Sequence, residues 1–284
     1  MIKIVLVSHD IIVKNLKGTI MNQFLKITLF IIVSTSSLFA ITAKQFVNSA
    51  DCTQTIDKEF LNICYDYDLK AAKAVSYTLY GDLVNELNIK KRPSFKVERS
   101  VSRSYRASNS DYRGSGYDKG HLANDAEFDW SKESLNATYT LANIIPQARR
   151  VNRYTWTKAE RYARFVAVQR GKINIINVVK YSNNPKRIGK HGIAVPVGFY
   201  KVLYSDDQSY TKCLYYENDN NIITSEDRLR DHVIDCKEVS FRIKRRTCSS
   251  FDTWEEAQQW FEDKNHGWKR MDGNHDGVAC QSLQ

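Results

Sequence analysis

Runs of β-branched residues alternate with short polar segments from about residue 77 onward, and this pattern predicts a sheet. The run 173–179 (Ile-Asn-Ile-Ile-Asn-Val-Val) is β-branched at five of seven positions, so we predict a central strand there. Further strands are expected at 193–196, 199–204 and 211–216, with a turn over 206–209. The segment 100–116 is rich in Ser, Tyr and Arg and is predicted to be a loop or an edge strand.

Apolar residues recur at helical spacing over 153–170, which predicts a helix that buries Trp156, Ala159, Ala163, Val166 and Ala167. The segments 44–76 and 226–233 are mixed in polarity and are also expected to be helical. Helices together with several strands predict an α+β fold in which a mixed sheet is flanked by helices.

The N-terminal region has the pattern of an export signal. A short polar start at Met21 is followed by an apolar run over 27–39 and by small residues at Ala40 and Ala43. This predicts a signal peptide over 21–43 and an exported protein, periplasmic or extracellular, with no stable membrane anchor. Residues 1–20 are expected to be a mis-assigned extension. A retained anchor is the alternative, although the run is short for a membrane span.

Six cysteines in an exported chain predict three disulfides. Six cysteines allow fifteen pairings, and spacing alone does not choose among them. Proximity along the chain favours Cys52–Cys64, Cys213–Cys236 and Cys248–Cys280. Free buried thiols are the alternative.

The formal net charge of +10 favours a polyanionic partner but does not choose between nucleic acid and an anionic membrane. The segment 141–190 has twelve bases and one acid, a difference of 11 that matches the whole excess of the chain, although such a charge run could also be a solvated face. That segment contains one acid, Glu160, and twelve bases: Arg149, Arg150, Arg153, Lys158, Arg161, Arg164, Arg170, Lys172, Lys180, Lys186, Arg187 and Lys190.

Candidate chemistry is concentrated in 117–160. His121 could act as a general base, with Asp118 holding its ring. Asn152 offers an amide oxygen, which suits a hard cation such as Mg²⁺. Glu160 lies about two helical turns further on and could bind the waters of that ion. Two of these residues also have a structural interpretation: His121 as a turn residue and Asn152 as a helix N-cap.

Taken together, 117–160 resembles the core of the DNA/RNA non-specific endonucleases with a ββα-metal (His-Me finger) site. In that family an Asp-Arg-Gly-His motif is followed by Asn-x-x-Pro-Gln and then by Asn, Trp and Glu. The matching residues here are His121, Asn143, Asn152 and Glu160, with Lys119 in place of the usual Arg. The resemblance extends over about 77–204.

The resemblance implies an α+β nuclease core over 44–244 and a role for each matching residue. His121 would take a proton from the attacking water, and Mg²⁺ (or Mn²⁺) on Asn152 would stabilise the phosphate charge. Lys119 would stabilise the phosphate electrostatically. Asn143 would fix the turn that carries the metal ligand, and Arg92 would bind a further phosphate.

A secreted, Mg²⁺-dependent endonuclease acting on DNA and/or RNA is therefore the predicted function. Contacts to phosphate do not distinguish DNA from RNA, and oligomeric state stays open. Two other hypotheses are a catalytically weak nucleic-acid-binding protein on the same fold and a secreted calcium-binding structural protein.

The C-terminal segment 247–284 is predicted to be a separate small domain that follows a basic linker at 244–246. A capping box from Thr253 to Glu256 predicts a helix. Asp272, Asn274 and Asp276 occupy positions 1, 3 and 5 of a calcium loop, but position 12 lacks its glutamate. The segment resembles the excalibur calcium-binding domain, which implies stabilisation by a disulfide and by Ca²⁺. An Asx-rich turn without metal is the alternative.

Overall fold

The computed structural model describes residues 51–84, 88–207, 209–239, 247–251, 253–262 and 271–284. The predicted leader over 21–43, the extension before it and the linker at 244–246 lie outside the described residues. Within the described ranges, no helix has both the length and the apolar character needed to cross a bilayer.

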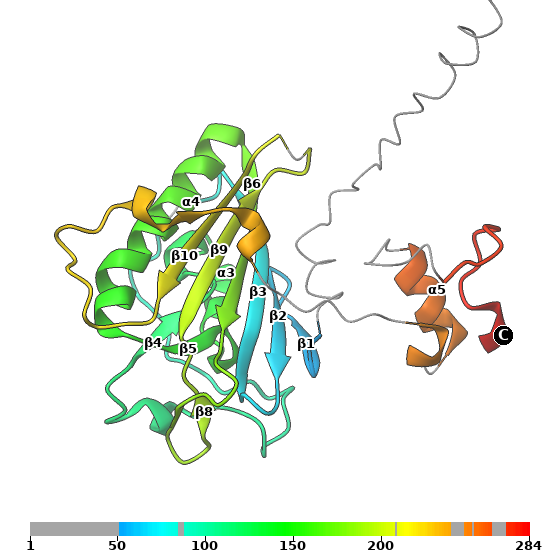
Figure 1. Ribbon diagram of the computed structural model, residues 1–284, viewed down its shortest axis with the longest axis horizontal. Coiled ribbons are helices and arrows are strands. Elements are labelled where there is room, and N and C mark those ends of the chain that lie inside the picture. Colours follow the sequence, from blue (N-terminus) through cyan, green and yellow to red (C-terminus); the bar gives the residue numbers. More distant parts are fainter. Residues whose placement is uncertain (1–50, 85–87, 208, 240–246, 252, 263–270) are drawn as a thin grey trace, which may run out of the picture. The chain divides into compact units, whose positions relative to one another are not determined.

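A seven-stranded sheet forms the centre of the fold before the C-terminal segment (Figure 1). The middle strand is β6 (Lys172–Lys180), and its residues 173–179 are all buried, including Asn174 and Asn177 among the β-branched residues. In order, the sheet contains β1 (Gln54–Asp57), β2 (Leu61–Asp66), β3 (Ala71–Tyr80), β6, β9 (Gly198–Tyr204), β10 (Thr211–Glu217) and β11 (Val233–Ile234).

The predicted strands 173–179, 199–204 and 211–216 are confirmed. The prediction of a mixed sheet is wrong, because every described pairing between these strands is antiparallel. The connection from β3 to β6 contains helices, but β6 runs antiparallel to β3. The two strands are therefore not joined by a parallel crossover.

Two predicted helices are also corrected. The described part of 44–76 forms β1, β2 and the start of β3. Its polarity is mixed because β1 is only partly buried, whereas β2 and β3 are mostly buried. In place of a helix over 226–233, the chain makes one short 3₁₀ turn (Leu229–His232) and then β11.

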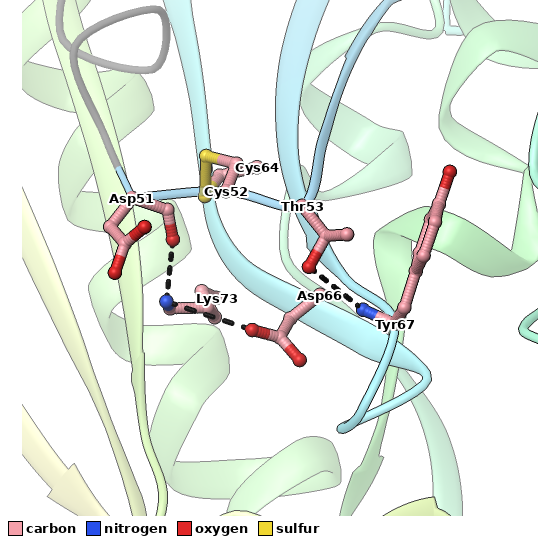
Figure 2. The surroundings of a disulfide bond; sticks show 7 residues. All are labelled: Asp51, Cys52, Thr53, Cys64, Asp66, Tyr67 and Lys73. Carbon is pink, nitrogen blue, oxygen red and sulfur yellow. Dashed lines mark hydrogen bonds and ion pairs between the residues drawn. A yellow bond between two sulfur atoms is a disulfide. The ribbon is translucent and has the colours of Figure 1, made fainter. Parts of the chain in front are cut away.

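A disulfide and two polar contacts of one lysine hold the first strands together (Figure 2). Cys52 is bonded to Cys64 of β2. Lys73 Nζ donates to the Asp51 carbonyl at 2.6 Å and lies 3.7 Å from the Asp66 carboxylate. The disulfide therefore ties the start of the described chain to β2, and Lys73 of β3 links both segments by polar contacts.

The helix α4 (Trp156–Arg170) packs against β3 and β6 (Figure 1). It confirms most of the predicted helix over 153–170, and its buried face includes all five predicted apolar residues. Trp156 anchors its first turn against Phe199 and Tyr216, with ring centroids 5.8 and 5.4 Å away. The helix ends at Gly171, whose φ of 78° favours glycine.

The ribbon of β4 (Asp118–His121) and β5 (Ile144–Gln147) precedes α4 in the chain, which gives the order strand, strand, helix. Between the two strands lie a 3₁₀ turn (Asp125–Glu127), α3 (Lys132–Thr138) and a second 3₁₀ turn (Leu141–Asn143). A 3₁₀ turn at Asn109–Tyr112 precedes β4 within the predicted loop 100–116. A second ribbon pairs β7 (Arg187–Ile188) with β8 (Ile193–Ala194).

All three predicted disulfides are confirmed: Cys52–Cys64, Cys213–Cys236 and Cys248–Cys280. The second disulfide joins β10 to a 3₁₀ turn at Cys236–Glu238, and the third lies in the C-terminal segment.

The C-terminal segment has its own small core, built from α5 (Trp254–Glu262) and the loop after residue 270. The predicted helix after Thr253 is confirmed, and Glu256 N–H donates to Thr253 Oγ1 at 3.3 Å. Trp254 Nε1 donates to the Ala279 carbonyl at 2.9 Å, which joins helix and loop. Short 3₁₀ turns at Cys248–Ser250 and Gln281–Leu283 flank this core.

Candidate active site

The pairing of β4 with β5 sorts the residues of the Asp-Lys-Gly-His motif onto two faces of the ribbon. Lys119 and His121 share one face, where Phe95 lies 4.7 Å from Lys119 Nζ and 5.3 Å from the His121 ring. Asp118 and Gly120 occupy the other face, and a side chain at Gly120 would collide with Gln147. The glycine is therefore required by the close packing of β5.

His121 lies in an aromatic pocket. The rings of Phe95 and Tyr139 are 5.3 and 4.9 Å from its own. Its Nε2 atom is buried and has no hydrogen-bond partner among the residues that the structure describes. Burial lowers the pKa of His121 to about 4; the charge of Asp125 opposes this shift and that of Arg92 adds to it. The ring is therefore neutral at neutral pH, as a general base must be.

The suggestion that Asp118 holds the His121 ring is wrong. Its carboxylate points to the other face of the ribbon, where it accepts from Arg153 Nε at 2.7 Å and from Arg153 Nη2 at 2.9 Å. It also accepts from Asn152 Nδ2 at 3.1 Å, and Arg149 Nε lies 3.9 Å away. Asp118 therefore organises the residues at the start of the helix.

Asn152 lies in a π-helical turn (Val151–Thr155) immediately before α4, so it is not the N-cap of that helix. Such wide turns are frequent at functional sites because they re-aim a side chain. With Nδ2 bound to Asp118, the Oδ1 atom faces away from that carboxylate and can accept a cation.

Glu160 is buried on the inner side of α4, with 6% of its surface exposed. Burial and the nearby Glu127 raise its pKa to about 8, while Lys201, Arg164 and a hydrogen bond with Asn124 act in the opposite direction. This carboxylate therefore lies in a buried cluster of charged groups.

Asn143 is fully buried, and its side-chain hydrogen bonds go to Ala123 and Thr138. Its Oδ1 accepts from Ala123 N–H at 2.9 Å, and its Nδ2 donates to the carbonyls of Ala123 and Thr138 at 3.0 and 2.9 Å. Asn143 therefore fixes the backbone just after His121, and its role toward the turn that carries Asn152 stays a prediction.

Arg92 is held by two carboxylates next to the histidine pocket. Its Nε lies 3.1 Å from Asp125, and its Nη2 donates to Asp129 at 2.9 Å. Tyr139 OH also donates to Asp125, at 2.7 Å, so Arg92 is connected to the aromatic wall around His121. Two of its five N–H groups are used by carboxylates and a third by the Ile89 carbonyl.

Several residues around the site were not among the predicted site residues. They are Asn124, Glu127, Tyr77, Asn177 and Lys201. These residues are joined to Glu160, to one another or to the backbone next to His121 by hydrogen bonds and electrostatic interactions. One signal was present in the sequence: the predicted strand 199–204 places a lysine among apolar residues. The others have no local pattern, because they come from distant elements.

The residues at Asn152 fit a divalent oxygen-seeking cation: a fixed amide oxygen lies beside exposed Arg149 and Arg153, and substrate phosphates could complete the coordination. No group of three or more His, Cys, Asp or Glu side chains in the described ranges is arranged to hold a metal. Asn152 stays the predicted protein ligand.

The loop at Asp272, Asn274 and Asp276 also contains oxygen ligands. Asp272 accepts from the N–H groups of Asp276 and Gly277 at 3.1 and 2.9 Å. The Val278 N–H and the Asn274 and Gln281 amides lower the pKa of Asp276, which keeps it ionised. These bonds suit a calcium loop, and they are equally those of an Asx-rich turn.

The basic run over 141–190 does not form one uniform surface. Arg149 and Arg153 are exposed beside Asp118, with 61% and 57% of their side chains accessible. Lys158 is bound to Asp227 at 2.6 Å, and Lys172 to Asp206 at 2.6 Å. Only part of the predicted positive charge therefore lies next to the candidate site.

Comparison with known proteins agrees with this geometry. The family model of the DNA/RNA non-specific endonucleases matches residues 40–270. The chain is 32% identical over 164 residues to mitochondrial endonuclease G of Homo sapiens, covering 53% of this chain and 54% of that protein. It is 30% identical over 117 residues to a nuclease of Nostoc sp., covering 41% and 42%.

A solved structure, that of the EndoG/EndoGI complex, has the same fold. Its TM-score is 0.58 at 22% identity, and the match covers 65% of this chain and 81% of that one. This likeness shows the fold, which is of the α+β class. The chain belongs to the family of DNA/RNA non-specific endonucleases, and it spans about half the length of the endonuclease G relatives that it matches.

Proposed function

We propose that this protein is a divalent-metal-dependent endonuclease that hydrolyses phosphodiester bonds in DNA and/or RNA. The observation that carries the proposal is the arrangement of the β4–β5 ribbon. One face holds a neutral, buried histidine, and the other holds an aspartate that orients the Asn152 amide. A base and a metal ligand fixed by the same four-residue strand are what single-metal hydrolysis needs.

In this proposal, neutral His121 accepts a proton from the water that attacks phosphorus. Lys119, on the same face as His121, contributes positive charge next to the phosphate, and Arg149 and Arg153 attract the polyanion at the exposed side. Mg²⁺ or Mn²⁺ on Asn152 would supply Lewis-acid stabilisation of the phosphate and of the leaving oxygen. Glu160 would hold the waters of that ion, and Arg92 would bind a flanking phosphate.

Cleavage of plasmid DNA and of a long RNA by wild type, His121→Ala and Asn152→Ala tests the proposal. Wild type should cleave with Mg²⁺ and stop with excess chelator, and His121→Ala should lose about 10²–10⁴-fold. His275→Asn is a matched control, since its exposed left-handed position tolerates Asn and lies in the C-terminal loop. Binding without cleavage by wild type would favour the alternative of a catalytically weak nucleic-acid-binding protein.

We also propose that the protein is exported and that 247–284 binds calcium as an excalibur-like domain. Three disulfides support an oxidising compartment, periplasmic or extracellular. Expression with the natural N-terminal segment, followed by N-terminal sequencing of the mature chain, tests the first part. A new terminus just after residue 40 or 43 is expected, and a chain that keeps residues 21–43 in the cytosol would contradict export.

A further inference from the structure

Lys201 of β9 is fully buried, with 0% of its surface exposed, although it carries an ammonium group. Its Nζ donates to Tyr77 OH at 3.3 Å and lies 5.0 Å from the ring centroid of Trp156. A buried charge is tolerated only where opposite charge and hydrogen bonds offset its lost hydration. The groups around Lys201 therefore indicate what it does.

Two carboxylates provide that opposite charge. Glu127 and Glu160 are 1% and 6% exposed, and both interact electrostatically with Lys201. Tyr77 OH donates to Glu127 Oε2 at 2.7 Å, so one hydroxyl connects Glu127 to the lysine. Arg164 of α4 also faces the cluster and adds positive charge.

The same cluster contacts the backbone on both sides of the proposed site. Asn177 Nδ2 donates to Tyr77 OH at 3.1 Å and to the Leu122 carbonyl at 2.6 Å, and Leu122 directly follows His121. Trp156, under the Lys201 ammonium, is the first residue of α4 after the turn that carries Asn152. Lys201 is thus next to the elements that hold both the base and the metal ligand.

We propose that Lys201 is a positioning residue whose buried positive charge balances Glu127 and Glu160 and so holds the Glu160 carboxylate in place for the metal's waters. Without this charge, two carboxylates would share one buried space and repel each other. The inference rests on the proposed nuclease function and assigns an essential electrostatic role to a residue outside the motif.

A charge-rescue experiment tests the proposal. Lys201→Met keeps the volume and removes the charge. It should raise the Mn²⁺ concentration for half-maximal cleavage, or lower kcat, by about 10–100-fold, as for other residues that support metal-binding groups. Adding Glu127→Gln to this variant removes one unbalanced negative charge and should recover at least about tenfold of the loss. Lys201→Arg should retain more activity than Lys201→Met.

Lys212→Met is the matched control, because Lys212 lies 5.1 Å over the Tyr162 ring on the neighbouring strand, where no carboxylate cluster is described. Its Mn²⁺ dependence should equal that of wild type. If Lys201→Met does not fold, Glu127→Gln alone still tests the proposal, since removing one of two balanced acids should shift the Mn²⁺ midpoint while Tm changes little.

Equal Mn²⁺ midpoints together with equal kcat values in wild type, Lys201→Met and Glu127→Gln would overturn the proposal, as would a double variant no better than Lys201→Met. A lysine that serves packing alone would lower Tm without any rescue by Glu127→Gln. Failure of the nuclease function itself would appear differently, as an inactive wild type.

Discussion

The Asn152 Nδ2 atom donates to Asp118 Oδ2 at 3.1 Å, and this bond joins the first residue of β4 to the turn before α4. It holds the amide nitrogen against Asp118, so the Oδ1 atom of the same amide is left for another partner. Arg153 binds the same carboxylate at 2.7 and 2.9 Å and holds it ionised. The hydrogen bond to Arg153 and that to Asn152 lower the pKa of Asp118 against the effect of its partial burial.

Asp118→Asn should therefore weaken metal binding while the fold is retained. An asparagine offers only one acceptor atom and loses the ion pair, so Asn152 is free to rotate. The Mg²⁺ concentration for half-maximal cleavage should rise about 10–100-fold. Asp82→Asn, at an exposed position, is the control, and an unchanged Mg²⁺ midpoint in Asp118→Asn would show that the bond does not orient the metal ligand.

Several strands and the disulfides could be predicted from patterns of neighbouring residues in the sequence. The run 173–179 is buried along its whole length. Its β-branched residues favour a strand over a helix, so the strand could be predicted. The three disulfides join the cysteines nearest in the chain. The motifs over 117–160 place Asp118 and Asn152 in one stretch, and the structure joins them by a hydrogen bond, whereas His121 lies on the opposite face of the ribbon.

What could not be predicted depends on contacts between distant segments. The partner of Asp118 is decided by the face of β4 on which it lies, and that face follows from pairing with β5 rather than from the motif. Lys201 and Glu127 are 74 positions apart in the sequence and meet through Tyr77. Asn143 supports the backbone at Ala123 for the same reason, through long-range bonds with no local signature.

The stability of the metal-free protein should fall in mild acid because of His121. Its pKa is about 4 when folded and about 6.5 in an exposed chain, so between these values only the unfolded state binds the proton. The contribution of His121 to the free energy of unfolding is therefore fully present above about pH 6.5 and is lost as the pH falls towards 4.

Urea unfolding of wild type and His121→Ala in chelator at pH 7 and pH 4.5 measures this effect. Wild type should lose more stability than the variant, by on the order of 1–3 kcal/mol, because the variant lacks the titrating group. Equal losses in the two proteins would mean that the folded ring titrates normally.

Calcium should bind the full chain through the loop at Asp272, Asn274 and Asp276. Two carboxylates and an amide oxygen within one turn suit Ca²⁺, with a Kd of about 10⁻⁴–10⁻³ M expected for an extracellular module. Isothermal titration of wild type and Asp276→Ala should show binding heat that the variant lacks. Identical titrations for the two would leave the loop as an Asx-rich turn, and Asp231→Ala, at an exposed site, controls for loss of charge.

Lys119 stands where the family has an arginine, and its surroundings explain how a lysine can serve. Its Nζ donates to Asn109 Oδ1 at 2.9 Å and lies 4.7 Å over the Phe95 ring, on the face of β4 that carries His121. The ammonium is thus already positioned as a point charge beside the proposed phosphate. The planar fork of an arginine would add a second hydrogen bond but no further charge.

Lys119→Arg should retain activity within about tenfold, equal to about 1.4 kcal/mol of barrier, because the charge stays on the same face. Lys119→Ala should lose about 10²-fold or more, as when other electrostatic donors are removed. Single-turnover cleavage of one DNA duplex by the three proteins separates these effects from substrate binding. A hundredfold gain in Lys119→Arg over a nearly inactive wild type would instead identify Lys119 as the reason for lost catalysis, and the nucleic-acid-binding alternative would then hold.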